Sequence, residues 1–413
     1  MNINQKRWFR LADFLGLFVA SLAITAHVGC GSDADDIAIS PMLNLDSGLQ
    51  PLDLAISIAF HPDGQILYSG IAPYLPNQSE NGDPRVIAWD LATGKPVAEI
   101  PTEQFPMALA TSRDGTTVVV GEGYVTPHPI RHPQRENARS SVRGKVRILR
   151  SDTLQEQQSI KTEFGILDMA FSPASNQLAL LGARGESKII LAIWQWPKLE
   201  TVAQFEFEGR PPFSAEMGPT NLVQYSGDGK WLIATIVSSQ NDEEVDAEAD
   251  DSLSGKIVVV NAGENTLHGE LIIDEGPICC ISLSPDNRQV VGSGYACFHL
   301  FNVGLESLTS KIQLDFSPLT EWRGLFSKLQ KNTIFIVPQS DSRYQPRFSG
   351  GVVMVEKIEK RSEWKFVQSF YSDNSSAIKR YTAFAVSGDE RLVAVGTSGV
   401  IRIWERGNSE THE

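Results

Sequence analysis

A short turn recurs seven times along this chain, and each copy lies between two runs of alternating apolar and polar residues. The clearest copy is ISIAF-HPDG-QILYSG, residues 56–70, in which HPDG separates the two runs. The other six turns lie at 112–115, 172–175, 226–229, 284–287, 327–330 and 387–390. Alternation with a period of two indicates β-strands, and turn residues between two such runs predict a hairpin. The chain is therefore predicted to consist of seven similar units.

Each unit continues into a third alternating run. The third runs lie at 85–90, 145–150, 189–196, 256–261, 297–302, 351–356 and 400–405. A fourth run, such as PVAEI, QFEFE, HGELII or KFVQSF, follows before the next turn. Four strands in each of seven units, with no long amphipathic helix between them, predict an all-β fold. We expect a seven-bladed β-propeller of four-stranded antiparallel blades over residues 37–413.

The turns and third runs resemble those of the WD40 family. Trp89-Asp90 is a WD dipeptide at the end of a third run, and Trp404-Glu405 is close to one. The units average about 54 residues, against about 40 to 45 in a typical WD40 repeat. The Gly-His pair that usually opens a WD40 unit is missing, so other seven-bladed classes stay open. The resemblance implies a rigid scaffold that binds proteins.

The last unit supplies only three runs, so closing the ring requires an outer strand from elsewhere in the chain. An open ring would expose two long sheet edges. Residues 37–45, IAISPMLNL, form an apolar run ahead of the first unit and are predicted to pair as the outer strand beside 400–405. The alternative is that residues 37–45 lie over the surface without pairing.

Residues 1–29 have the pattern of an export signal, with three bases ahead of an apolar stretch at 14–26. This stretch is shorter than the roughly 20 residues of a spanning helix, so an uncleaved anchor is the weaker alternative. The triplet Val-Gly-Cys that ends at Cys30 resembles a bacterial lipobox, although His27 stands where an aliphatic residue is usual. The resemblance implies lipidation of Cys30 and a tether at 30–36. Ordinary secretion, with cleavage after one of the neighbouring glycines, stays open.

The charge balance restricts the kind of partner. The 413 residues include 36 Lys and Arg against 50 Asp and Glu, a net charge of −14. Binding to nucleic acid requires a basic surface for phosphate contacts, so we expect no nucleic-acid partner. Four cysteines, Cys30, Cys279, Cys280 and Cys297, are too few and too unevenly spaced for a disulfide scaffold or a zinc ribbon.

Long insertions interrupt four of the units between their second and third strands. They lie at 71–84, 121–144, 237–255 and 338–350. Connections of this kind leave a propeller on one face, which we call the insertion face, and long loops on a compact scaffold often carry function. A closing outer strand would begin on the opposite face, so we expect the chain before residue 37 to leave from there.

Two of the insertions have opposite charge. The basic one contains Arg131, Arg135, Arg139 and Arg143, and the acidic one contains Asp242, Glu243, Glu244 and Asp246 among seven acids. Complementary charges of this kind steer a partner onto a surface. The alternative is that both are solvated loops without a ligand. The acidic run lacks the spacing of a calcium loop, and prolines around His128 and His132 forbid the helix that a zinc pair would use.

Carboxylates lie in or beside the connections that precede the first strand of each unit. They include Asp53, Glu103, Glu163, Asp274 and Glu321. In a propeller these connections surround the mouth of the central channel, where a ring of acids would attract a cation. This suggests one alternative function, an enzyme similar to the lactonase and dehydrogenase propellers that holds a divalent metal at the channel mouth.

The favoured interpretation is a non-enzymatic propeller, anchored in a bacterial cell envelope by its N-terminal lipid, that binds a protein or peptide through the insertion face. No nucleophile motif, phosphate-binding loop or dinucleotide fingerprint occurs in the chain, and no cofactor is expected. A secreted or periplasmic soluble protein is the alternative location.

Overall fold

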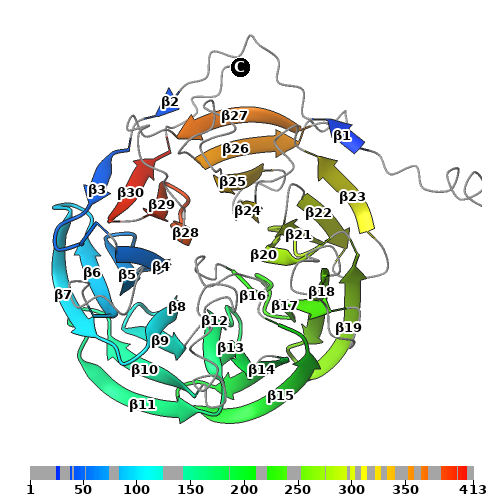
Figure 1. Ribbon diagram of the computed structural model, residues 1–413, viewed down its shortest axis with the longest axis horizontal. Coiled ribbons are helices and arrows are strands. Elements are labelled where there is room, and N and C mark those ends of the chain that lie inside the picture. The colour runs from blue at the N-terminus through cyan, green and yellow to red at the C-terminus, as the bar shows by residue number, and fades with distance from the viewer. Residues whose placement is uncertain are drawn as a thin grey trace, which may run out of the picture.

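Seven sheets are arranged as blades around a ring in the computed structural model (Figure 1). The structure describes residues 25–27, 38–39, 41–51, 53–73, 83–123, 143–185, 187–210, 221–239, 253–274, 276–294, 298–302, 308–313, 321–326, 333–339, 352–357, 364–370, 383–397 and 399–406. Over these residues the elements are all strands. Six blades contain four consecutive strands each, and the remaining sheet combines the last three strands with one from the N-terminal region.

Blades 1 to 4 follow one another along the chain. Blade 1 contains β4 (Asp53–Phe60), β5 (Ile66–Pro73), β6 (Arg85–Asp90) and β7 (Lys95–Pro101). Blade 2 contains β8 (Phe105–Thr111), β9 (Thr117–Gly123), β10 (Gly144–Arg150) and β11 (Glu156–Thr162). Blade 3 contains β12 (Gly165–Phe171), β13 (Gln177–Arg184), β14 (Lys188–Gln195) and β15 (Glu200–Glu208). Blade 4 contains β16 (Val223–Tyr225), β17 (Trp231–Ser239), β18 (Leu253–Asn261) and β19 (Thr266–Ile273).

Blades 5 to 7 complete the ring, and three short N-terminal strands join them. Blade 5 contains β20 (Ile278–Leu283), β21 (Gln289–Gly294), β22 (Phe298–Asn302) and β23 (Leu308–Gln313), with β1 (Thr25–His27) beside β23. Blade 6 contains β24 (Glu321–Phe326), β25 (Thr333–Gln339), β26 (Val352–Lys357) and β27 (Trp364–Phe370), with β2 (Ala38–Ile39) beside β27. Blade 7 contains β28 (Ala383–Val386), β29 (Leu392–Thr397), β30 (Val400–Glu405) and β3 (Leu43–Leu45).

The predicted repeat agrees with this order of strands. Each of the seven predicted turns lies between the first and second strand of a blade, and each predicted third run coincides with a third strand to within a few residues. The runs at 85–90 and 400–405 coincide with β6 and β30 residue for residue. The prediction of an all-β propeller with four-stranded antiparallel blades is therefore confirmed.

The apolar core lies between neighbouring blades, because alternate residues of each strand point to opposite faces of the sheet. In β6, Val86 and Ala88 pack with Val118 and Val120 of blade 2. The alternate residues of β6, Ile87 and Trp89, pack on the other side with blade 7. The strands of a blade are therefore apolar on both faces, and each blade is stabilised by two neighbours.

The turns between first and second strands share one hydrogen-bond pattern. In blade 4, the hydroxyl of Ser226 donates to Asp228 over 2.5 Å and accepts the N–H of Trp231 over 2.9 Å. The same pair of bonds occurs at Ser112, Ser284 and Ser387. A serine and an aspartate two residues later hold each turn closed. This explains why the turn is the most regular part of the repeat.

The predicted closing strand at 37–45 is only partly correct. Leu43–Leu45 pair antiparallel with Ile401–Ile403 of β30 and complete blade 7, and Leu45 is fully buried. Ala38 and Ile39 instead pair in parallel with Ser369 and Phe370 of the preceding blade. The outer strand of blade 6 offers an unpaired edge, so the chain uses that edge before it reaches blade 7.

The predicted exit of the chain before residue 37, opposite the insertions, falls on residues 28–37, which lie outside the described residues. β2 runs parallel to β27, the outer strand of blade 6, and therefore toward the insertion face, in the direction expected of an outer strand. The exit itself stays a prediction. In the described part of the chain, no helix is long and apolar enough to cross a membrane.

Candidate functional site

All four long insertions lie on one face of the ring. They connect β5 to β6, β9 to β10, β17 to β18 and β25 to β26, each the second and third strands of a blade. Of the charged residues predicted to form the docking surface, the structure describes Arg143. Arg131, Arg135, Arg139, Asp242, Glu243, Glu244 and Asp246 lie outside the described residues, as does Cys30.

Asp53, predicted as a channel-mouth acid, is buried in an ion pair. Its carboxylate Oδ2 lies 2.6 Å from Nη2 of Arg85 and accepts the N–H of Gln50 over 3.0 Å. Arg85 also donates to the carbonyl oxygen of Gly48, in the segment that joins β3 to β4. The Asp53 side chain is 1% exposed. Its charge is therefore used to tie the closing segment to blade 1 and is not offered to a ligand.

The other predicted acids have different surroundings. Glu103 is exposed and its Oε1 accepts a hydrogen bond from Nζ of Lys145 over 2.9 Å. That hydrogen bond lowers the pKa of Glu103. Glu163 and Asp274 are exposed, and Glu321 is the first residue of β24. Two of the five acids are thus neutralised by a base on the third strand of a blade.

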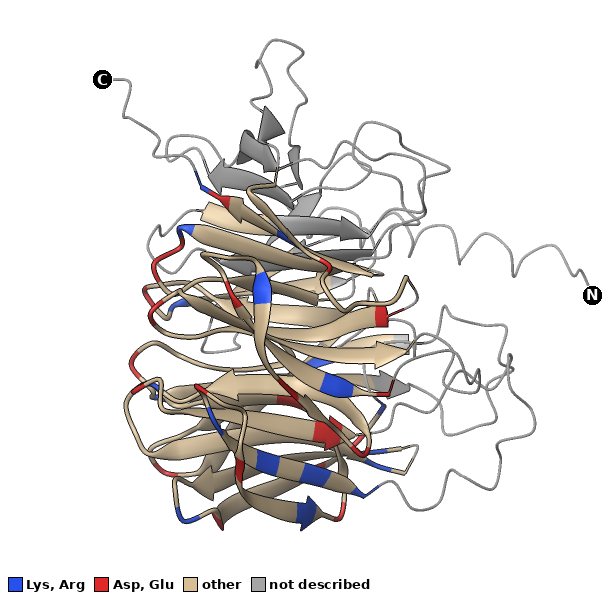
Figure 2. Cartoon of the chain, turned by 90° about the vertical axis from the view of Figure 1, so that its left-hand side faces the viewer, with Lys and Arg blue, Asp and Glu red and all other residues tan. Residues whose placement is uncertain are grey.

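Positive and negative residues are interspersed over the outer strands and turns of blades 1 and 2 (Figure 2). Within the described residues, no group of three or more His, Cys, Asp or Glu is arranged to hold a metal ion. Cys279 and Cys280 are buried in β20, the first strand of blade 5. Cys297 lies outside the described residues.

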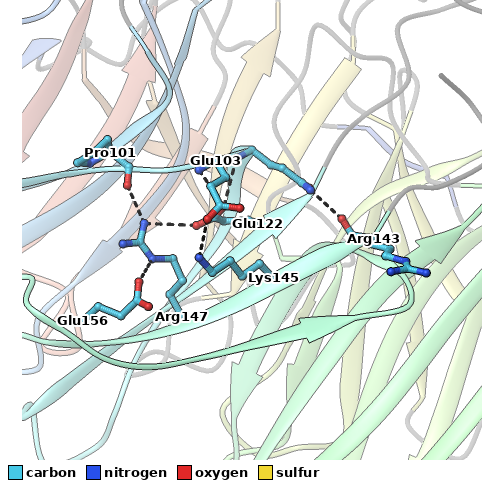
Figure 3. A network of polar contacts seen from close by, with 8 residues as sticks. Pro101, Glu103, Glu122, Arg143, Lys145, Arg147 and Glu156 are labelled. Carbon is cyan, nitrogen blue, oxygen red and sulfur yellow. Dashed lines mark hydrogen bonds and ion pairs between the residues drawn. The ribbon is translucent and has the colours of Figure 1, made fainter.

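A network of charged residues that sequence reasoning missed lies at the base of the basic insertion (Figure 3). Glu122 is the penultimate residue of β9, and its side chain is fully buried. Its Oε2 accepts the backbone N–H groups of Glu103 and Gln104, each over 3.1 Å. Its Oε1 lies 3.4 Å from Nη1 of Arg147. Arg147 also donates to Glu156 over 2.5 Å and to the carbonyl oxygen of Pro101 over 2.7 Å.

The network holds both ends of the insertion 121–144. Glu122 precedes it on β9, and Arg143 is the last residue before β10. The side-chain amide of Gln104 donates to the carbonyl oxygen of Arg143 over 2.9 Å. Residues 103 and 104, which connect blade 1 to blade 2, therefore bind the chain on each side of the insertion. The points at which the basic loop leaves the ring are fixed.

Burial and pairing shift the pKa of Glu122 in opposite directions. Burial raises the pKa of this carboxyl, while the two backbone N–H groups and the charges of Arg147 and Lys145 oppose the rise. Glu122 and Arg147 lie on the face of blade 2 that packs against blade 1, where Val118, Val120 and Leu149 form an apolar layer. The junction is thus apolar near the turns and ionic at the insertion face.

Asp168 joins blade 3 to blade 4 in another way. Its Oδ2 accepts the N–H groups of Leu222 and Val223, over 2.6 and 3.0 Å, and its Oδ1 accepts that of Met169. Burial raises the pKa of this carboxyl to about 6, and the three hydrogen bonds oppose the rise. This carboxyl bridges the innermost strands of two blades.

A signal for these residues is present in the sequence. Glu122 in the run TVVVGEG and Arg147 in the run KVRILR occupy positions where the alternation predicts an apolar residue. Asp168 occupies such a position in GILDMAF. A charge in the buried phase of a strand implies a partner. The partners could not be identified because they belong to another strand of the blade, to a neighbouring blade or to the connection between blades.

Comparisons with known proteins agree with the architecture. No protein-family model matches the chain, and no curated protein matches it in sequence. Among solved structures, the β-propeller domain of Myceliophteria thermophila Cps50 (Swd1) has a TM-score of 0.54 and 15% identity, covering 86% of this chain and 96% of that one. The Dos1 propeller has a TM-score of 0.54 and 12% identity, covering 86% and 78%. At these identities the likeness shows the fold alone, that of a WD40-like β-propeller.

Proposed function

We propose that this chain is a non-enzymatic scaffold that binds a protein or peptide through the insertion face. The observation that carries the proposal is the shared position of the four insertions, each between the second and third strand of its blade. A ring of blades packed on both sides supplies a rigid base, and rigid scaffolds commonly present their binding residues on such loops.

The network around Glu122 supports a binding role for the basic insertion. Its buried carboxylate and the amide of Gln104 fix both ends of the loop to the connection between blades. Restricting the ends of a loop reduces the conformational entropy that a partner must remove on binding. The four arginines at 131, 135, 139 and 143 would steer an acidic partner segment to this side of the face.

A photo-crosslinking amino acid placed at single positions tests this proposal in the native host. We expect Arg135 of the basic insertion to crosslink to one defined protein. Asp114, which is exposed on the opposite face, should not. With the crosslinker kept at position 135, reversing the two neighbouring charges, Arg131 and Arg139, to Glu should abolish the crosslink. Equal crosslinking from both faces, or none from the insertion face, would contradict the proposal.

We also propose export to a bacterial envelope and lipidation of Cys30. The separate position of β1 is compatible with removal of residues 1–29, because blade 5 keeps four strands without it. Cys30→Ser should abolish incorporation of a fatty-acid label and release the protein from the membrane fraction. Membrane retention of the unlabelled variant would favour an uncleaved anchor instead.

The alternative of a metal-dependent enzyme at the channel mouth receives less support. Asp53 and Glu103, two of its five candidate ligands, are paired with Arg85 and Lys145. A carboxylate that is already paired with a base must break that ion pair before it can bind a metal ion with its full charge.

A further inference from the structure

Blades 5 and 6 each have an extended segment of chain added in parallel to the outer edge. β1 pairs with β23 through Thr25 and Lys311, Ala26 and Ile312, and His27 and Gln313. β2 pairs in the same sense with the last two residues of β27. Both blades already have their four antiparallel strands. β1 and β2 are therefore fifth strands that follow one another around the rim (Figure 1).

Both added strands occupy the same part of an outer strand. The outer strands of blades 1 to 6 each contain a β-bulge, which in β23 leaves Thr309 unpaired and in β27 leaves Val367 unpaired. β1 and β2 lie beyond the bulge, where the ladder to the third strand is regular. A bulge twists an edge away from further pairing, so the available edge is the short stretch beyond it.

The corresponding stretches of other blades carry charges that oppose an added strand. Glu99 lies there in β7, Glu206 and Glu208 in β15, and Glu270 in β19. β23, LTSKIQ, and β27, WKFVQSF, contain no acid. Charged side chains on an edge strand discourage pairing with further chain. The edges that hold added strands thus lack carboxylates, a property they share with the stretch of β11 (Glu156–Thr162) beyond its bulge.

We propose that the edge of β23 is a docking site for an extended, uncharged peptide segment of a partner protein, which adds in parallel as a fifth strand. Main-chain hydrogen bonds would supply the affinity, as in other cases of strand addition. In the unprocessed chain, residues 25–27 occupy this edge. They precede Cys30, so cleavage there would vacate it. Docking of a partner therefore rests on the proposed envelope processing, whereas the capacity of the vacated edge to add a strand does not.

A labelled peptide with the sequence of residues 24–29, ITAHVG, is the probe, titrated into the full-length chain. A variant with both Ala26→Pro and His27→Pro removes two successive backbone N–H groups of β1, one of which points to β23, and should free the edge because proline cannot donate to a ladder. We expect this variant to bind the peptide at least about tenfold more tightly than the wild type, whose own strand competes at high effective concentration. Failure of the folded variant to bind would overturn the proposal.

Two further measurements keep the test independent of that variant. A disulfide between Ala26→Cys and Ile312→Cys, which are register partners, should abolish peptide binding, and reduction should restore it. Successive N–H groups of a strand point to opposite sides, so N-methylation of the peptide at Ala or at His should abolish binding in one case only. Equal effects at both positions would exclude strand addition. If the peptide results are as expected but the chain is found uncleaved in the envelope, the proposed cleavage before Cys30 is wrong, while the capacity of the β23 edge to add a strand still holds.

Discussion

At the residue scale, Glu122 and Arg147 replace apolar side chains at one end of the junction between blades 1 and 2. Desolvating two charges is costly, and their mutual attraction and hydrogen bonds offset the cost. Glu122 uses both carboxylate oxygens and Arg147 contacts three acceptors. Loss of one partner would leave the other buried and incompletely paired, so this junction should be sensitive to single substitutions.

Glu122→Gln should destabilise the protein by about 3 kcal/mol, because the amide carries no charge to balance the buried Arg147. The measurement is the urea midpoint of unfolding. Glu103→Gln is the matched control: its side chain is 72% exposed and also faces a base, so the midpoint should hardly move. Equal losses in the two variants would show that burial of Glu122 is not the cause.

Asp168 should make stability depend on pH. Its pKa is about 6 in the folded chain, against an ordinary value of 3.8. Between these values the folded state binds more protons than the unfolded state, so this group's contribution to stability is lost as the pH rises from about 4 to about 6. Asp168→Asn should lack this trend. Unfolding free energies of wild type and variant, measured at each pH, should therefore differ by a changing amount; a constant difference would contradict the assignment.

At the element scale, the turns between first and second strands are stabilised by their own side chains. The serine hydroxyl and the aspartate carboxylate together satisfy backbone N–H groups that the hairpin leaves unpaired. Turns of neighbouring blades also touch: the Nη1 of Arg113 donates to the carbonyl oxygen of Pro173, and the N–H of Gly227 donates to Asn287. The turn face is therefore a connected rim.

Ser226→Ala should lower stability by about 1 to 2 kcal/mol, because the N–H of Trp231 loses its acceptor, the hydroxyl of the buried Ser226. The hydrogen bond from Ser226 lowers the pKa of Asp228, so the contribution of this pair is present at neutral pH and is lost as the pH falls below about 4. The serine variant should consequently lose less stability than the wild type on acidification. Parallel acid titrations followed by circular dichroism measure this; identical loss in both proteins would contradict the turn assignment.

At the scale of the whole molecule, closure of the ring depends on β3. Leu45 packs with residues of both β30 and blade 1, including Ile401, Ile403 and Trp89, so one side chain bridges the first and last blades. Arg85 adds a polar tie to the segment after β3. Because the core is divided among the junctions between blades, an open junction would expose an apolar sheet face as well as an edge.

Leu45→Ala should destabilise the protein by about 2 to 4 kcal/mol through the cavity it leaves, and should promote aggregation on warming. Met42→Ala, three residues earlier and 48% exposed, is the control and should behave like the wild type. Thermal unfolding followed by light scattering distinguishes the two. Equal unfolding temperatures and equal aggregation of the two variants would contradict a role of β3 in closing the ring.

The strands and their order could be predicted from the sequence, because period-two alternation and the Ser-x-Asp turn are local properties. β6 and β30 were located to the residue on that basis. The position of the insertions on one face followed from strand order alone. Residues 38–39 and 43–45 were predicted as parts of one strand, and the pairing of residues 25–27, within the predicted export signal, was not predicted. Pairing at an edge depends on which edge lies nearest in space.

Local alternation determined the propeller and the face that bears its long loops. Tertiary structure alone decided what the charged residues do. Asp53 was predicted at the channel mouth and is bound to Arg85, while Glu122, Arg147 and Asp168 were not singled out and bridge neighbouring blades. The free energy of a charge depends on its burial and on partners brought from 32 to 54 residues away, as between Arg85 and Asp53 or Leu222 and Asp168. A pattern that repeats along the chain carries no information about such pairs, because each is made only once the strands are assembled into blades and the blades into the ring.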